Sequence, residues 1–217
     1  LDLFKSWDIQ EHDVLLDIGA NVGQTMLKWK AANRGATYIG VEPLPACAEY
    51  LYQLSERNQF VNVHILNAAV YDQSGSFKLH LQFDEPTDRT ASLISTPDSI
   101  HAIDVDTLTF DQLMNMLDVV PEKFKIIKID AEGAELNILE SMSSYLTDHN
   151  PIIIMEVLAG TGLKAESKLK RLLSLIDRLN YVPYRVKKSG NNLDRLERID
   201  TIDPGTSVYD SDYVLIK

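Results

Sequence analysis

The stretch DVLLDIGANVG at residues 13–23 has the pattern of a buried strand that ends in a tight turn and opens a helix. Val14–Leu16 is an apolar run too short for a helix, and Gly19 permits backbone conformations that are closed to other residues. Residues 25–29 continue with helix-compatible spacing. In an open α/β sheet, ligands bind in the crevice at the carboxyl end of such a strand. The stretch therefore predicts an α/β fold with a ligand site at this turn.

A second short strand pattern, at residues 37–41, predicts that Glu42 reaches the same edge of the sheet. Glu42 follows Gly23 by 19 positions. In nucleoside-binding βαβ units, an acidic residue meets a ribose hydroxyl about 20 positions after the glycine turn. We therefore expect Glu42 to bind a ribose. The alternative is an ordinary strand-to-helix turn with a solvated Glu42.

The turn departs from the dinucleotide fingerprint G-x-G-x-x-G, which would need glycine at positions 21 and 24. Asn21 and Gln24 stand there, and the Asn21 side chain obstructs the close approach of a pyrophosphate. A ligand poor in phosphate fits better. S-adenosylmethionine is such a ligand, because it offers ribose hydroxyls to Glu42 and carries a sulfonium cation. Asp17 would place negative charge near that cationic end.

Composition sets the class of protein. The chain has 217 residues, enough for one sizeable core and slightly too few for two comfortable domains. Its net charge of −11 argues against a nucleic-acid partner, because phosphate binding needs clustered Lys and Arg. No apolar run reaches the roughly 18 residues of a membrane span, so we expect no membrane association. Cys47 is the only cysteine, which excludes an intramolecular disulfide and favours a reducing, cytoplasmic setting.

The rest of the chain alternates strand and helix patterns, with one interruption. Apolar and polar residues alternate over residues 77–83, which is typical of a strand with one wet face, and residues 103–108 are its expected antiparallel partner. A polar loop at 84–100 joins them, so we expect an inserted ribbon and loop at about residues 76–108. The other expected strands lie at 61–66, 124–129, 152–155, 181–186 and 213–217, and the expected helices at 45–57, 110–117, 134–146 and 165–180.

This alternation predicts a single domain over residues 1–217, built as a three-layer α/β/α sandwich with ligands at the carboxyl edge. We expect a mostly parallel sheet of seven strands. The two closing strands flank a loop rich in Gly, Asn and Asp, and an antiparallel C-terminal edge strand would explain them.

Five motifs together resemble the FkbM-type methyltransferases, a Rossmann-like class I branch of the S-adenosylmethionine-dependent enzymes. They are LDIGANVG at 16–23, GVEP at 40–43, NAA at 67–69, LTFD at 108–111 and, most specific, IKIDAEGAE at 127–135. The resemblance covers roughly residues 13–157. It implies O-methylation of a hydroxyl on a small molecule such as a sugar or polyketide-like acceptor. The cofactor-binding residues that it implies are Asp17, Gly19, Ala20, Asn21, Gly23, Glu42 and Pro43, with Asn67 and Ala68 beside the adenine.

The candidate catalytic residues are acids at strand ends. Methyl transfer from a sulfonium is an in-line displacement, so much of the acceleration comes from holding the acceptor oxygen against the methyl carbon. A protonated alcohol is a poor nucleophile, and a positioned base helps it. Asp130 and Glu132 follow the fourth parallel strand and Glu156 follows the fifth, so we expect all three at the ligand edge as catalytic carboxylates.

Other roles stay open for these side chains. Glu132 also suits the first turn of a helix, and Asp130 also suits the ammonium group of the cofactor. Lys128 shares side-chain parity with Asp130, and we expect it to pair with a buried acid. Two of the carboxylates could instead hold Mg²⁺. We expect no metal, because Glu156 has no further Asp or Asn beside it and the site is sparse.

Two rival functions follow from the same residues. A nicotinamide-dependent oxidoreductase is disfavoured by Asn21 and Gln24, and comparing the binding of S-adenosylhomocysteine with that of NAD would separate it. A non-catalytic nucleoside-binding domain is disfavoured by the three strand-end acids, and only turnover would decide.

Overall fold

The computed structural model describes residues 3–85, 87–88, 90–95, 97–117, 124–158, 163–189, 192–204 and 211–217. Its main sheet is built from β1 (Val14–Ile18), β2 (Thr37–Val41), β3 (Val63–Leu66), β7 (Ile126–Ile129), β8 (Ile152–Glu156), β9 (Val182–Ser189), β10 (Asn192–Arg198) and β11 (Asp212–Ile216). The strand order is β10-β9-β11-β8-β7-β1-β2-β3. The five strands from β3 to β8 run parallel, so their carboxyl ends meet at one edge.

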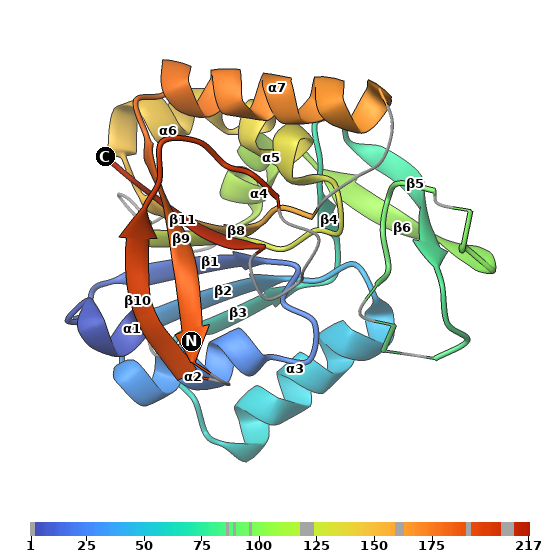
Figure 1. Ribbon diagram of the computed structural model, residues 1–217. Coiled ribbons are helices and arrows are strands. Elements are labelled where there is room, and N and C mark those ends of the chain that lie inside the picture. The colour runs from blue at the N-terminus through green and yellow to red at the C-terminus, as the bar shows by residue number, and fades with distance from the viewer. Residues whose placement is uncertain are drawn as a thin grey trace.

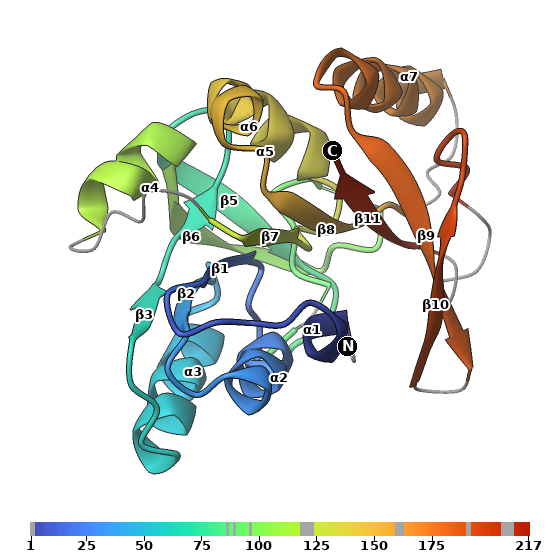
Figure 2. The ribbon, with the colours of Figure 1, turned by 90° about the vertical axis from the view of Figure 1, so that its left-hand side faces the viewer.

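Helices cover both faces of the sheet (Figure 1, Figure 2). One face carries α1 (Leu3–Ser6), α2 (Gln24–Ala32) and α3 (Pro45–Arg57), and the other carries α4 (Phe110–Met116), α5 (Glu135–Ser141), α6 (Ser143–His149) and α7 (Leu163–Arg178). β1 supplies both cores, because successive side chains of a strand point to opposite faces. Leu15 packs with Met26 and Trp29 of α2, whereas Leu16 and Ile18 pack on the other side. The expected three-layer α/β/α fold is confirmed.

The sheet differs from the expected one at its C-terminal side. It has eight strands in the described residues where we expected seven, because the segment expected as a loop contains β10. The sequence of β10, NLDRLER, is mostly polar, as suits a solvated edge strand. β11 is antiparallel to its neighbours as expected, but it lies inside the sheet between β8 and β9, so β10 forms the edge.

A smaller sheet contains β4 (Ala69–Val70), β5 (Gly75–Leu81) and β6 (His101–Leu108), in the order β4-β6-β5. β5 and β6 pair antiparallel along their length. Leu79, Leu81 and Val105 of this ribbon pack against Leu44 and Cys47, at and just before the start of α3. Figure 1 shows the ribbon beyond the carboxyl ends of the parallel strands, where it can form a wall of a site at that edge.

The helix expected at residues 134–146 is divided into α5 and α6. Met142 separates them with a backbone at φ −107° and ψ 12°, and its side chain is buried. The serines at positions 141, 143 and 144 are weak helix formers, because their hydroxyls compete for backbone hydrogen bonds. None of the described helices is long and apolar enough to cross a membrane.

Candidate functional site at the carboxyl edge of the sheet

A cavity of about 570 Å³ lies at the carboxyl ends of the parallel strands. Its walls come from the segments that follow β1, β2, β3, β7 and β8, from the start of β11, and from the ribbon loop between β5 and β6. Of the residues expected from sequence, those that line it are Gly19, Ala20, Asn21, Glu42, Pro43, Ala68, Asp130, Glu132 and Glu156. Asp17, Gly23 and Asn67 are not among the lining residues.

Gly19 sets the geometry of the turn after β1. Its φ is +80°, and a Cβ at this position would lie 1.8 Å from the carbonyl oxygen of Asp130. The N–H groups of Gly19 and Ala20 both donate to the Val41 carbonyl oxygen, at 3.0 and 3.2 Å. The turn therefore fits between the ends of β2 and β7, and only glycine allows this closeness.

Gly23 acts below the cavity. Its φ is +82°, and a Cβ there would meet the side chains of Leu51 and Leu54 at 2.8 and 3.0 Å. Gly23 therefore lets the start of α2 pack closely on α3, which supports the turn from below.

Glu42 is 6% exposed and lies at the end of β2. Its two carboxylate oxygens accept hydrogen bonds from the backbone N–H groups of Asn21 and Leu44, each at 2.8 Å. Burial raises the pKa of Glu42, and these two donors partly oppose the change. Asn67 donates from its side chain to the carbonyl oxygens of Glu42 and Pro43, at 2.9 and 3.0 Å. Asn67 thus orients the Glu42 segment from outside the cavity.

Asp17 is not among the residues that line the cavity, and its expected place beside a bound cation stays a prediction. Its side chain is fully buried, and one carboxylate oxygen accepts a 2.6 Å hydrogen bond from the Tyr38 hydroxyl. The other lies 3.3 Å from the ammonium group of Lys128. Lys128 also donates to Asp130, at 3.0 Å. The expected pairing of Lys128 with a buried acid is confirmed, and Lys128 joins that acid to the cavity.

The charges in this group support one another. Burial alone would lower the pKa of Lys128, but the carboxylates of Asp17 and Asp130 outweigh it and raise that pKa above the usual range. Burial raises the pKa of Asp17, and Lys128 and Tyr38 oppose the rise. Lys128 is therefore a fixed positive charge in the cavity floor.

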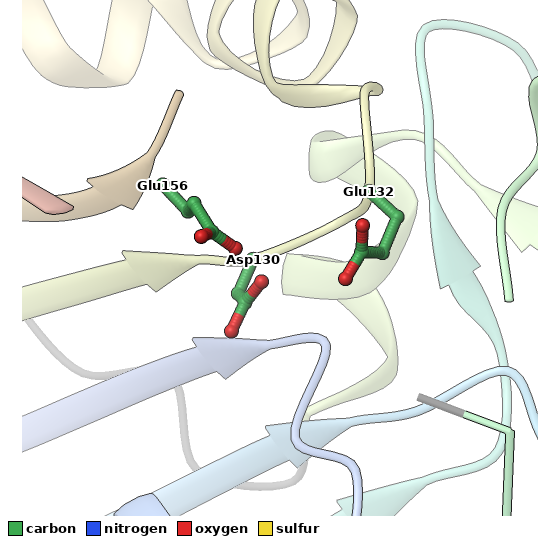
Figure 3. A group of neighbouring side chains, drawn as sticks. All are labelled: Asp130, Glu132 and Glu156. Atoms are coloured by element: carbon green, nitrogen blue, oxygen red, sulfur yellow. The ribbon is translucent and has the colours of Figure 1, made fainter. Parts of the chain in front are cut away.

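Three carboxylates converge above this floor. Figure 3 shows Asp130, Glu132 and Glu156 pointing toward one another, and ligand atoms of all three lie within 4.8 Å. Burial, followed by the charges of Asp130 and Glu156, raises the pKa of Glu132 to about 7. Burial also raises the pKa of Glu156, against a 2.6 Å hydrogen bond from the Ser211 hydroxyl. The cluster offers a proton acceptor that is half ionised near neutral pH, and its spacing would also suit a shared cation.

Sequence reasoning missed Tyr38, which supports the site from β2 by its hydrogen bond to Asp17. Gly40 is the feature of the sequence that could have indicated the inward position of Tyr38. The two residues share one face of β2, and a Cβ at Gly40 would lie 2.8 Å from the Tyr38 ring. From the loop, Thr87, Asp88, Ala91 and Leu93 line the cavity. These residues belong to the polar, proline-broken loop expected at 84–100.

Comparisons with known proteins agree on one family. The model of the Methyltransferase FkbM domain matches residues 17–183. Hexuronic acid methyltransferase AglP of Haloferax volcanii is 27% identical over 176 residues, which cover 80% of this chain and 69% of that protein.

Solved structures share the fold. A methyltransferase FkbM from Methylobacillus flagellatus has a TM-score of 0.56 at 15% identity, over 95% of this chain and 44% of that one, so this chain spans less than half of its length. An S-adenosylmethionine-dependent O-methyltransferase from Thermotoga maritima has a TM-score of 0.52 at 10% identity, over 98% of this chain and 62% of that one.

Replacing Lys128 should reveal how far the buried charges depend on one another. Lys128→Met leaves the Asp17 carboxylate buried without a cation, and we expect a loss of about 3–5 kcal/mol in the free energy of unfolding. The matched control is Lys125→Met, which removes a more exposed ion pair to Asp13 at 2.6 Å and should cost about 1 kcal/mol or less. Urea unfolding measures both, and equal losses would contradict the assigned role of Lys128.

Proposed function

Since this chain belongs to the FkbM methyltransferase family and is an S-adenosylmethionine-dependent methyltransferase, we propose that it methylates a hydroxyl group of a sugar-like acceptor. The observation that carries the proposal is the cluster of Asp130, Glu132 and Glu156 in the cavity, with a pKa of Glu132 raised to about 7. A hydroxyl is the acceptor that gains most from such a base.

The residues of the cavity fit the cofactor. Its volume of about 570 Å³ is within the range of roughly 300–1,000 Å³ for small-molecule sites. The Glu42 carboxylate keeps acceptor capacity beyond its two backbone bonds and suits the ribose diol. Pro43 and Ala68 supply apolar surface beside the expected adenine position. Asp130, held by Lys128, suits the ammonium group of the methionine part.

We assign the proton transfer to Glu132 and cofactor binding to Asp130. Asp130 accepts a hydrogen bond from the Lys128 ammonium group, and this contact fixes its carboxylate as a group that binds a cation. Glu132 is desolvated, its neighbouring charges are acidic, and its pKa of about 7 matches neutral conditions. Bound S-adenosylmethionine supplies an electrophilic methyl group, and Glu132 would accept the hydroxyl proton as the acceptor oxygen attacks.

A neutral hydroxyl suits this cavity better than an anionic acceptor group. The three converging carboxylates would repel a carboxylate placed between them. The cationic residues among the described lining are Lys28, on α2, and Lys128, which is already engaged by Asp17 and Asp130. The AglP relative, whose name specifies a hexuronic acid, supports a sugar as the acceptor class.

We propose no metal for the reaction. Lys128 already donates to Asp130, and the Ser211 hydroxyl donates to Glu156, so two of the three carboxylates have donors that compete with a cation. A hydroxyl activated by Glu132 needs no Lewis acid for its proton to leave.

The acceptor is tested by offering methyl-labelled S-adenosylmethionine with neutral glycosides and with the matching glycosiduronates. We expect transfer to hydroxyl groups, giving methyl ethers that survive mild alkali, and no loss of rate after chelation of divalent cations. Label that mild alkali releases would come from methyl esters, and that result would contradict a hydroxyl acceptor. Activity that falls on chelation and returns with Mg²⁺ would contradict the metal-free site.

Glu42→Ala tests the ribose contact. We expect the affinity for S-adenosylhomocysteine to fall by roughly 1.5–3 kcal/mol, the scale of a lost charge-assisted hydrogen bond. Titration calorimetry measures it, and NAD should give no heat of binding with either protein. Glu49→Ala, on the exposed side of α3, is the matched control and should bind normally. Full affinity in a folded Glu42→Ala protein would remove Glu42 from the ribose.

Two isosteric variants separate the roles of the acids. Glu132→Gln should lower kcat by about 10²–10⁴-fold and leave cofactor affinity unchanged, because it removes the base. In the unmodified enzyme kcat should rise with pH around 7, as Glu132 loses its proton. Asp130→Asn should mainly weaken cofactor binding. The opposite result, a large fall in kcat with normal affinity in Asp130→Asn alone, would make Asp130 the base.

A further inference from the structure

The turn that carries Glu132 is held by side chains from three separate elements. The Ser92 hydroxyl, from the ribbon loop, donates to the Glu132 carbonyl oxygen at 2.7 Å. Glu135 of α5 accepts a hydrogen bond from the Gly133 N–H at 2.8 Å. Lys168 of α7 donates to the Gly133 carbonyl oxygen. Two adjacent residues thus have three backbone groups bound by side chains.

This turn needs support because its backbone is unusual. Glu132 has a φ of +45°, and Gly133 follows with a φ of +102°. A left-handed conformation in a residue other than glycine costs about 1–3 kcal/mol and persists only where surrounding contacts hold it. The direction of the Glu132 carboxylate therefore depends on the groups that bind this turn.

Ser92 is itself fixed in place. It is 5% exposed, and its backbone pairs with His80 of β5 through two hydrogen bonds of 2.8 and 3.0 Å. Its hydroxyl oxygen accepts from the Ile94 N–H at 3.0 Å, so its single proton is directed at the Glu132 carbonyl. Ser92 is a rigid link between the ribbon and the turn.

The same loop contacts the cavity. Ala91 and Leu93, on either side of Ser92, line the cavity while the Ser92 side chain binds the Glu132 peptide. Asp88 organises the loop, because its carboxylate accepts from the N–H groups of Gln82, Phe83 and Thr90 and from the Thr90 hydroxyl. A molecule that packs on Ala91 and Leu93 therefore presses on the segment that holds Glu132.

We propose that Ser92 is a positioning residue that fixes the Glu132 carboxylate in the cavity and transmits acceptor contact with Ala91 and Leu93 to it. The inference rests on the proposed role of Glu132 as base. Without the Ser92 hydroxyl, the Glu132 turn loses one of its three side-chain contacts, and its strained backbone relaxes and admits water.

Charged groups face Glu132 from every side of its pocket. Asp130 ends β7, Glu156 ends β8, Glu135 lies in α5 and Asp88 lies in the ribbon loop; all four are acidic and raise the pKa of Glu132 after the effect of burial. A positive group also reaches this turn: Lys168 of α7 binds the carbonyl oxygen of Gly133, the residue after Glu132. A turn that opens to water would weaken both burial and these repulsions, so the pKa of Glu132 should fall.

The test reads Glu132 directly and needs no acceptor. Protein labelled with ¹³C at glutamate carboxyls is titrated by NMR, and Glu132→Gln assigns the resonance. We expect a midpoint near 7 in the unmodified protein and a downward shift of about one pH unit in Ser92→Ala. Ser92→Cys preserves side-chain size with a weak donor and should shift likewise, whereas Ser92→Thr retains the hydroxyl and should restore the midpoint.

The matched control is Thr90→Val, which removes a loop hydroxyl that binds Asp88 and does not contact Glu132. Its midpoint should equal that of the unmodified protein. With the best sugar of the acceptor panel, Ser92→Ala should lower kcat about tenfold at neutral pH with unchanged affinity for S-adenosylhomocysteine. An unchanged midpoint in folded Ser92→Ala and Ser92→Cys, or an equal shift in Thr90→Val, would overturn the proposal. If no sugar is methylated, the acceptor assignment fails while the titration still decides the role of Ser92.

Discussion

The close approach of the Gly19 turn to the end of β7 is the constraint on which the site depends. A side chain at Gly19 would overlap the Asp130 carbonyl oxygen, so the two strand ends can lie side by side only with glycine there. This contact places the turn expected at the cofactor directly beside the turn that carries the acids. In the proposed mechanism the cofactor and the proton acceptor would therefore share one backbone junction. Methyl transfer depends on such fixed positioning, because the reacting atoms must be held nearly in line.

Beneath this junction, buried charged groups give Asp130 and Glu132 different surroundings. Tyr38, Asp17 and Lys128 form a continuous polar chain in the sheet, and its last member reaches Asp130. Asp130 therefore has a cation beside it, while Glu132, two residues later, has mainly acids around it. Two carboxylates two residues apart thus have different surroundings, and burial together with the neighbouring acids raises the pKa of Glu132. The same arrangement gives Asp17, near the end of β1, a structural role: its carboxylate pairs with the lysine that binds Asp130.

Local sequence predicted the parts of the fold whose side chains repeat with a clear period. α3 has the expected bounds, Pro45–Arg57, and the parallel strands were found because they are apolar runs. β10 was missed because its sequence is mostly polar, and an edge strand of this kind cannot be told from a loop by its composition. Strand ends could be located from sequence, and this was enough to predict the positions of Gly19, Glu42 and the three acids. The direction of the Asp17 side chain depends on Tyr38 and Lys128 in neighbouring strands, and no local pattern encodes those contacts. Ser92 meets Glu132 across 40 positions, a contact that only tertiary packing creates.

The interior position of β11 has a consequence for how the molecule is made. Among the described strands, β9 pairs with β10 and β11, so the hairpin of β9 and β10 is joined to β8 in the sheet through β11. Ser211, which donates to Glu156, immediately precedes that strand. During synthesis the cofactor turn and the acids at positions 130 and 132 leave the ribosome well before β11, yet the acid cluster receives its last hydrogen-bond donor only when β11 docks. Closure of the sheet and placement of the Ser211 donor therefore depend on the same long-range pairing of β11 with β8.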